Sequence, residues 1–250
     1  MTPREVFGGA ALAAIGAVLL WAPTAGASTT PCSGVLGPVL VDNVVVPGGA
    51  SCQLEGTQVS GNVVVEARGA VRAEINTAIR GDVVGRRNAI LSISRTAIGG
   101  NVGCSGCRRV NIFETEVGGS VRLQSAAEAV FVTASPIVGD LEIVAGAAGG
   151  EITRGVVFGN LLFSGNRGPL MMVRQFVGGD MRIVENVSPV GFTLLENLIG
   201  KSLAFNRNTG PSAINANSIG ETLACFENDP APTGSGNVAA ELTGQCEALG

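Results

Sequence analysis

The sequence predicts an all-β fold, a right-handed parallel β-helix (solenoid) of about nine coils of roughly 20 residues, with a disulfide at both ends. Three observations support this prediction. A short phrase recurs at a nearly constant interval, and the abundant glycine and β-branched residues favour turns and strands. Cysteines spaced by about one coil lie near both ends of the repeats.

The recurring phrase consists of an aliphatic residue, a spacer, a glycine, a small polar residue and a second aliphatic residue, as in Val59–Val63. Its glycines are Gly61, Gly81, Gly100, Gly119, Gly139, Gly159, Gly179, Gly200 and Gly220, at intervals of 19 to 21 residues. A fixed period near 20 indicates units that bury their apolar faces only by stacking on their neighbours. The spaced leucines of a leucine-rich repeat are missing, and a propeller blade needs about twice this period.

The aliphatic runs between these glycines, such as Val63–Val65 and Ala89–Ile93, are too short for helices and end near Gly, Asn or Pro. We therefore expect two or three short strands in each coil. Parallel crossover connections are right-handed in about 98% of cases. Left-handed β-helices use hexapeptide repeats, which do not fit this period, so we expect a right-handed solenoid.

Residues one coil apart lie above one another, so equal offsets form columns along the solenoid. Two aliphatic columns are expected to face inward and form the core. The first contains Val59, Ile79, Ile98, Val117, Ile137, Val157 and Val177, and the second contains Val63, Val83, Val102, Val121, Leu141, Leu161 and Met181.

Three polar columns are also expected. The residues after the glycines, for which stacked turns are favoured over a calcium array, are Asn62, Asp82, Asn101, Ser120, Asp140, Asn160 and Asp180. A second column of stacked amides is predicted from Asn88, Asn166, Asn186, Asn208 and Asn228. A hydroxyl column contains Thr57, Thr77, Thr96, Thr115 and Ser135 and fails at Gly155, Gln175 and Glu196. Packing at a corner is favoured for it over a flat ice-binding face.

Residues 1–27 are predicted to be a signal peptide, and residues 28–250 a single β-solenoid domain with an N-terminal cap and a C-terminal loop cap. An uncharged apolar run, Gly8–Trp21, follows Arg4, and Ala25–Ala27 provides a small-x-small cleavage pattern. A retained membrane anchor is the alternative, but the run is shorter than the ~17–25 residues of a spanning helix. We expect a secreted or extracellular protein, with the cell surface as a further location and no membrane contact after cleavage.

Six cysteines in an exported chain favour structural disulfides. Coils that stack directly would bring cysteines 20 or 21 residues apart within bonding range. The Cys-x-x-Cys motif has no βαβ context, so a disulfide across its tight Ser-Gly turn is favoured over a redox centre. The predicted pairs are Cys32 with Cys52, Cys225 with Cys246, and Cys104 with Cys107, although six cysteines allow other pairings.

The phrase Thr57–Val65 and the endings Leu223–Cys225 and Gly244–Cys246 resemble repeats of uncharacterised secreted bacterial β-solenoid proteins. The repeat is also similar to that of bactofilins, cytoskeletal proteins whose right-handed β-helices polymerise end to end. The resemblance covers Val41–Cys246 and implies a β-solenoid without catalytic residues. Bactofilins generally have neither a signal peptide nor disulfide caps, and this sequence departs from them in both respects.

The favoured function is that of a non-catalytic secreted structural, surface or adhesive β-helix protein of unknown ligand. The net charge of −4 indicates no particular partner, and no cofactor, metal site, nucleic acid or oligomer is expected. A cell-wall or extracellular glycan is the candidate partner, because six arginines lie between positions 80 and 109. The candidate contacts for an anionic polymer are Arg80, Arg86, Arg87, Arg108 and Arg109.

Two alternatives remain open. An extracellular polysaccharide lyase or hydrolase would need clustered acids in a groove, for which Glu114 and Glu116 are expected on one strand face and Arg122 beside Glu142 on adjacent coils. Coil lengths within one residue of 20 leave only short loops, and the chain has no His and no Tyr, so catalysis is the less favoured alternative. The second alternative is an end-to-end polymerising scaffold, and segment Asp229–Gly236 is expected to cover one end instead.

Overall fold

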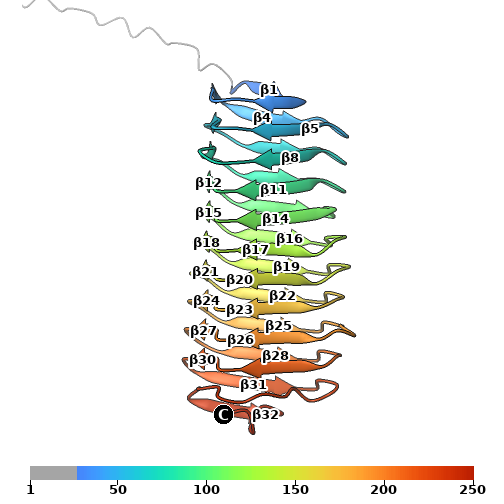
Figure 1. Cartoon of the computed structure of the whole chain (residues 1–250), viewed down its shortest axis with the longest axis vertical. Helices are drawn as coiled ribbons and strands as arrows, with labels where there is room; N and C mark the ends of the chain where they lie inside the picture. Colours follow the sequence, from blue (N-terminus) through green and yellow to red (C-terminus); the bar gives the residue numbers. More distant parts are fainter. Residues whose placement is uncertain (1–26) are drawn as a thin grey trace, which may run out of the picture.

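The structure is a computed structural model that describes residues 27–250. It is an all-β parallel solenoid of about 11 turns, stacked into an upright rod with the C-terminus at its lower end (Figure 1). The described residues contain no helix, and therefore none that could cross a membrane. The predicted signal peptide lies outside the described residues, except for Ala27.

Three parallel sheets, here named A, B and C, form the walls of the solenoid, and each coil adds one short strand to each sheet. Sheet A contains β1 Thr29–Pro31, β4 Asn43–Val46, β7 Val63–Val65, β10 Val83–Gly85, β13 Val102–Ser105, β16 Val121–Gln124, β19 Leu141–Val144, β22 Leu161–Ser164, β25 Met181–Val184, β28 Leu203–Asn206, β31 Thr222–Phe226 and β32 Glu241–Gly244.

Sheet B contains β2 Gly34–Leu36, β5 Ser51–Leu54, β8 Ala70–Ala73, β11 Ile90–Ser94, β14 Arg109–Phe113, β17 Val130–Thr133, β20 Gly150–Thr153, β23 Leu170–Val173, β26 Phe192–Leu195 and β29 Ser212–Asn215. Sheet C is narrower and contains β3 Leu40–Val41, β6 Gln58–Val59, β9 Ala78–Ile79, β12 Ala97–Ile98, β15 Glu116–Val117, β18 Pro136–Ile137, β21 Val156–Val157, β24 Phe176–Val177, β27 Leu198–Ile199 and β30 Ser218–Ile219. We name the corners between the sheets A–B, B–C and C–A.

The predicted number of nine coils is too low, because the repeated glycines mark only the C–A corners of the middle coils. A Cβ atom on Gly81 would overlap the Gly61 backbone and the Asn62 side chain of the preceding coil. The first C–A corner stacks only on the start of the described chain. Asp42 occupies there the position that glycine takes in the corners of the middle coils. At the other end, β32 extends sheet A past the last repeat.

One coil is longer than predicted. Arg167 is still paired with Val187, 20 residues later, but Leu170 is paired with Phe192, 22 residues later. The two extra residues therefore lie in the A–B corner at 188–191. They also shift the register of the last predicted glycines, because Lys201 rather than Gly200 donates its N–H to the carbonyl of Gly179.

Both predicted aliphatic columns are confirmed as the core. Val121, for example, is paired with Val102 and Leu141 on either side, and none of the three is exposed. The first column continues through Ile199 and Ile219, and the second runs from Val44 to Leu203 and Leu223. Because each side chain packs between copies of its own position, the apolar core is continuous along the rod.

At two places in the core, a glycine in one coil leaves space for a larger side chain from a neighbouring coil. At Gly85, an inward position, a Cβ would meet the Cys107 sulfur, which is bonded to Cys104 with a Cα–Cα distance of 5.9 Å. At Gly150 a Cβ would lie 3.3 Å from the ring of Phe163. In both cases a missing side chain makes room for a larger group from an adjacent coil.

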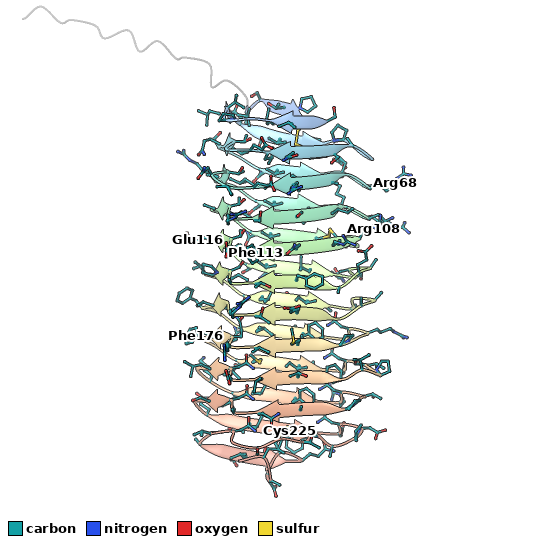
Figure 2. The ribbon with its side chains drawn as sticks, viewed as in Figure 1. Arg68, Arg108, Phe113, Glu116, Phe176 and Cys225 are labelled. Atoms are coloured by element: carbon teal, nitrogen blue, oxygen red, sulfur yellow. A yellow bond between two sulfur atoms is a disulfide. The ribbon has the colours of Figure 1, made fainter. Side chains whose placement is uncertain are left out.

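The predicted terminal disulfides, Cys32–Cys52 and Cys225–Cys246, are confirmed, with Cα–Cα distances of 5.5 and 5.2 Å. Neither pair occupies a single column. The strand partner of Cys52 is Gly34, two residues after Cys32, and the partner of Cys225 is Gly244, two residues before Cys246. Each bond is therefore a diagonal tie between coils rather than a vertical one (Cys225 is labelled in Figure 2).

The A–B corner contains a buried asparagine ladder. The side chain of Asn186 donates to the carbonyl of Phe163 at 3.0 Å and to Oδ1 of Asn208 at 2.9 Å, while its own Oδ1 accepts from the backbone of Asn166. The ladder ends at Gln245, which accepts from Asn228. Asn88 was wrongly assigned to this column, because it is exposed and has a left-handed backbone with φ 61°.

The hydroxyl column is buried at the B–C corner, as predicted, and the threonine side chains donate to backbone carbonyls such as Leu54 O from Thr77 at 3.0 Å. Burial contradicts the alternative of a water-facing ice-binding array. The hydroxyls give way at Gly155 and Gln175, as predicted, but Glu196 is not in the column, because the two-residue shift places Asn197 there. It continues as Gly155, Gln175, Asn197, Asn217 and Asn237.

The column after the corner glycines forms a third ladder, as the turn hypothesis predicted. Each side-chain oxygen accepts the backbone N–H of the next coil, for example from Asn101 to Asp82 at 2.7 Å and from Asn160 to Asp140 at 2.8 Å. The ladder begins at Asn43 and reaches Ser202. The side-chain hydrogen bonds of this ladder thus follow the same coil-to-coil register as the pairing of the strands.

We expect Val121→Asp to abolish folding, because a carboxylate at this fully buried position has no partner and costs about 4 kcal/mol or more. Far-UV circular dichroism and urea unfolding measure the effect. The control Gln124→Asp adds the same charge at an exposed position of the same strand and should leave the urea midpoint unchanged. A folded Val121→Asp protein with the parental midpoint would contradict the inward column.

We expect Asn186→Ala to lower the free energy of unfolding by about 3 kcal/mol, because it leaves the Phe163 carbonyl and the Asn166 N–H buried without partners. Urea unfolding measures the loss. The control Asn88→Gly suits the left-handed backbone of an exposed position outside the ladder and should change stability little. Equal losses for the two variants would show that the ladder is not the cause.

Candidate binding site

The outer wall of sheet B changes character near the middle of the rod. Asn111, Phe131, Glu151 and Met171 are strand partners on four successive coils, so their side chains form one outward column. Phe131 is 38% exposed and Met171 is 41% exposed. Two large apolar side chains therefore face solvent two coils apart, with a carboxylate between them.

A surface hollow of about 470 Å³ lies over this column and the adjoining A–B corner. A second hollow of about 470 Å³ borders it and shares Ala129 and Phe131. We call the two together the sheet B hollow. Its lining residues are Arg109, Asn111, Glu128, Ala129, Phe131, Ala147, Ala148, Gly149, Gly150, Glu151, Arg167, Gly168, Pro169 and Met171.

Small residues shape the floor of the sheet B hollow. The segment 147–150 reads Ala-Ala-Gly-Gly and brings no bulky side chain to the wall. A side chain at Gly149 is excluded, because its Cβ would overlap the backbone of Pro169 in the next coil. The close approach of two coils thus requires glycine here, and the missing side chain leaves the wall recessed beside Phe131.

Charged groups border the hollow on its N-terminal side. The carboxylate of Glu128 accepts from Arg108 at 2.8 Å and from Arg109 at 2.6 Å, and these hydrogen bonds hold its pKa below the ordinary value. These hydrogen bonds favour the ionised carboxylate, so any stabilisation it provides is fully present above the ordinary pKa of a glutamate and is lost progressively as the pH falls through the lowered pKa. Within residues 27–250, Arg167 and Glu151 take part in no ion pair.

The structure divides the predicted arginine belt. Arg80 lies in a C–A corner, while Arg86 and Arg87 lie in the A–B corner at the other end of β10. Arg86 is 3.4 Å from Glu66. Arg108 and Arg109 lie one coil further on and share Glu128, so the belt is partly neutralised and only Arg109 lines the hollow. Arg108 is labelled at the A–B side in Figure 2.

The acidic pair expected for catalysis does not share a strand face. Glu116 is on β15, but Glu114 lies in the B–C corner with a left-handed backbone, φ 46°, and the buried Thr115 separates them. Figure 2 shows Glu116 on the sheet C side, across the rod from Arg108. The expected neighbours Arg122 and Glu142 are confirmed as strand partners, 3.4 Å apart.

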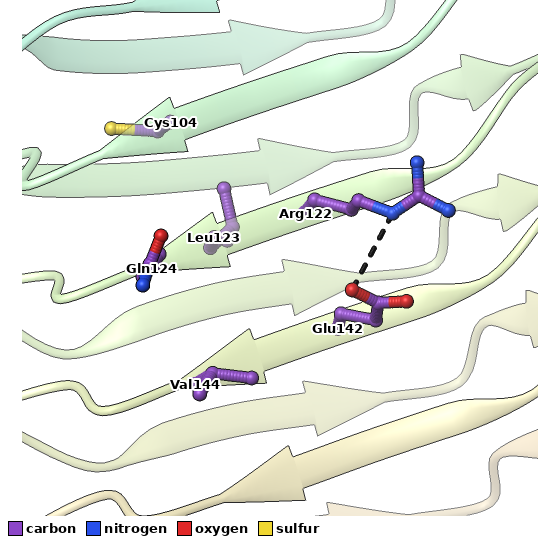
Figure 3. Close-up of a pocket in the computed structure, with 6 residues that line it drawn as sticks. All are labelled: Cys104, Arg122, Leu123, Gln124, Glu142 and Val144. Atoms are coloured by element: carbon purple, nitrogen blue, oxygen red, sulfur yellow. Dashed lines mark ion pairs between the residues drawn. The ribbon is translucent and has the colours of Figure 1, made fainter.

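This ion pair borders a smaller hollow of about 330 Å³ on sheet A (Figure 3). The hollow is lined by Cys104, Arg122, Leu123, Gln124, Glu142 and Val144. Its two charges already satisfy each other, and Cys104 is bonded to Cys107, so it offers fewer free groups than the sheet B hollow.

Sheet C carries a different exposed surface. Phe158 and Phe176 meet edge to face with their centroids 6.5 Å apart, and Val138 and Leu198 are half exposed beside them. None of these four residues lines the sheet A hollow or the sheet B hollow. This surface therefore provides an exposed aromatic residue on a second face, against which the sheet B hollow can be compared.

Among residues 27–250, no group of three or more Cys, His, Asp or Glu side chains is placed to hold a metal ion. Comparison with known proteins gives no match, whether with protein-family models, with curated proteins or with solved structures. The geometry of the walls is therefore the basis for a functional proposal.

Sequence reasoning missed the sheet B hollow, since its apolar residues belong to no repeated motif. One signal was present: the Ala-Ala-Gly-Gly segment at 147–150 is a run of small residues where other coils have larger ones. The partner of Arg108 and Arg109 was also missed, because Glu128 lies 20 and 19 residues after them, respectively, and meets them only through coil stacking.

We expect Glu128→Gln to strengthen retention on a sulfated polymer about threefold at low ionic strength, because it frees two arginines beside the hollow. Affinity chromatography measures the change. The control Glu142→Gln makes the same charge change but frees only Arg122, on sheet A. Equal gains for the two variants would mean that net charge, rather than this arginine pair, controls retention.

Proposed function

We propose that the protein is a non-catalytic extracellular scaffold that binds a glycan in the sheet B hollow. One observation carries this proposal: an exposed aromatic ring, Phe131, joins an apolar recess to a polar border formed by Arg109, Asn111 and Glu128. A sugar ring has the matching character, with C–H groups on its faces and hydroxyls around its edge.

The two parts of the hollow suggest how such a ligand would lie. A ring stacked on Phe131 would place its C–H face over the aromatic surface. Its hydroxyls would then reach the amide of Asn111 and the ionised groups of Arg109 and Glu128. Arg167 and Glu151 lie further along the rod and would meet the next sugar of a chain.

The scaffold part of the proposal rests on the regularity of the walls. Stacked ladders and a disulfide near each end make a stiff rod, in which only short connections join consecutive strands from β1 to β31. Binding groups on such a wall are held in place before the ligand arrives, which lowers the entropic cost of binding. Disulfides suggest an oxidising compartment, and together with the predicted signal peptide they support an extracellular location.

The C-terminal tail argues for a capped rod rather than an end-to-end polymer. Thr233 bridges to Ala213 of β29, and Val238 bridges to Ser218 of β30, so the tail follows the last open edges of sheets B and C. Leu249 is 5% exposed and packs into the core. A second copy could not pair with these strands without displacing the tail.

We expect Phe131→Ala to weaken glycan binding about tenfold, because it removes the stacking surface. The wild-type protein is first tested on an array of neutral and uronic acid-containing glycans, and the best ligand is then titrated by calorimetry. Phe158→Ala is the matched control, since it removes an exposed phenylalanine from a different wall and should leave the affinity unchanged.

Equal effects of the two variants, or no binding to any glycan on the array, would contradict the proposed site. The same incubations are analysed for newly formed reducing ends and unsaturated sugars. Depolymerisation of the bound glycan would contradict the non-catalytic part of the proposal, and its loss in Glu114→Gln or Glu116→Gln would assign it to the acids considered from the sequence.

A further inference from the structure

The described chain enters the solenoid at Ser28, and two of the polar groups of Ser28 meet one carboxylate. The backbone nitrogen of Ser28 donates to Oδ2 of Asp42 at 2.9 Å, and the Ser28 hydroxyl donates to the same oxygen at 2.8 Å. The Ser28 carbonyl accepts from the backbone nitrogen of Asn43 at 3.1 Å. The N–H, the hydroxyl and the carbonyl of Ser28 are therefore all hydrogen-bonded, and Ser28 is the first described residue that is anchored to the solenoid in this way.

Asp42 is an exception in its column. Most later coils have glycine at this position of the C–A corner, because the preceding corner leaves no room for a side chain. At the first corner the side chain has room and turns toward the start of the described chain. Its other oxygen, Oδ1, lies 3.3 Å from the Ser60 hydroxyl. The hydrogen bond from Ser28 is the largest cause of a lowered pKa at Asp42, so the carboxylate is ionised at neutral pH.

The cleavage pattern read from the sequence ends at the same point. Ala25–Ala27 supplies the small-x-small pattern, so the scissile bond is the one between Ala27 and Ser28. Hydrolysis of this bond consumes one water, leaves a carboxylate on Ala27 and leaves an amine on Ser28 that takes up a proton. The nitrogen that becomes charged is the one that already donates to Asp42.

We propose that Asp42 is the docking site for the α-ammonium group that signal-peptide removal creates at Ser28. Before cleavage the Ser28 nitrogen is a neutral amide with one proton to donate. After cleavage it is a cation with three, and a hydrogen bond between two ionised groups is shorter and stronger than one that involves a neutral donor. Export would thus tighten the first coil of the solenoid without any movement of the strands.

This inference rests on the predicted export signal and is independent of glycan binding. The other side chains that hydrogen-bond to Ser28 or Asp42 are Asn43 and Ser60, and neither is ionisable. Asp42 is therefore the titratable partner of the new amine. An ammonium group beside a carboxylate loses its proton less readily than a free one, so the amine should be less reactive than an ordinary chain terminus at neutral pH.

The test uses the full chain expressed with its own first 27 residues in a secreting bacterial host. Intact mass and N-terminal sequencing of the exported protein should show Ser28 as the first residue. The amine is then labelled with acetic anhydride at pH 7 and followed by mass spectrometry. Lys201 is the only lysine of the chain and is exposed, so it serves as the internal reference for reagent activity.

We expect Asp42→Asn to increase the labelling rate of the Ser28 amine about fivefold relative to Lys201, because the amine loses its ionised partner. The asparagine retains an oxygen that can accept from Ser28, and a circular dichroism melt checks that the fold is retained. The control Asp140→Asn makes the same change in a distant corner, where the oxygen accepts from Asn160. It should leave the Ser28 rate unchanged.

A first residue other than Ser28, or an uncleaved chain, would overturn the proposal. So would an Asp42→Asn protein that folds and labels at the wild-type rate. Loss of glycan binding in the Phe131→Ala variant has no bearing on these outcomes, so the two proposals stand or fall separately.

Discussion

Parallel backbone hydrogen bonds between successive coils set one register for the whole molecule, and side chains at equal offsets consequently meet copies of their own position. Val121 packs between Val102 and Leu141 in the core, and Asn186 bonds between Asn166 and Asn208 in the corner. The two extra residues at 188–191 therefore change which later residues occupy each column, as where Lys201 rather than Gly200 bonds to the carbonyl of Gly179. The core absorbs smaller mismatches locally, as where Gly85 makes room for Cys107 and Gly150 for Phe163.

The corners impose a second constraint, because each turn buries polar backbone groups beside the apolar core. Ladders of asparagine, threonine and glutamine side chains satisfy these groups one coil at a time, and a ladder needs a partner at its last rung. The A–B ladder ends on Gln245, and Asn237 in the B–C corner donates to the Leu249 carbonyl at 2.7 Å. The C-terminal tail thus closes the ladders as well as the strand edges. At the other end of the rod, Asp42 accepts a hydrogen bond from the backbone nitrogen of Ser28 and so provides a partner for the first polar group of the solenoid.

A wall that repeats so regularly offers little for a ligand to distinguish, and recognition depends on places where the repeat is broken. The sheet B hollow lies where small residues replace larger ones at 147–150 and where Gly149 permits a close approach of the next coil. The longer A–B corner at 188–191 follows in the coil after Pro169. The recess at 147–150 lies beside the exposed ring of Phe131 and near the Arg108–Glu128–Arg109 group, which is why we assign binding to this surface.

The sequence by itself determined the parallel solenoid, its inward columns and the cysteines that tie its ends, because all of these follow from period and offset, which can be counted along the chain. Only the tertiary structure decided which residues occupy the columns of the last coils. Lys201 takes the position that the sequence assigned to Gly200, and Asn197 takes the one assigned to Glu196. The tertiary structure also separated Asn88 from the asparagine ladder and Glu114 from the strand of Glu116. Such details depend on the backbone conformation of each corner, and a site such as the sheet B hollow depends on side chains that meet only across coils.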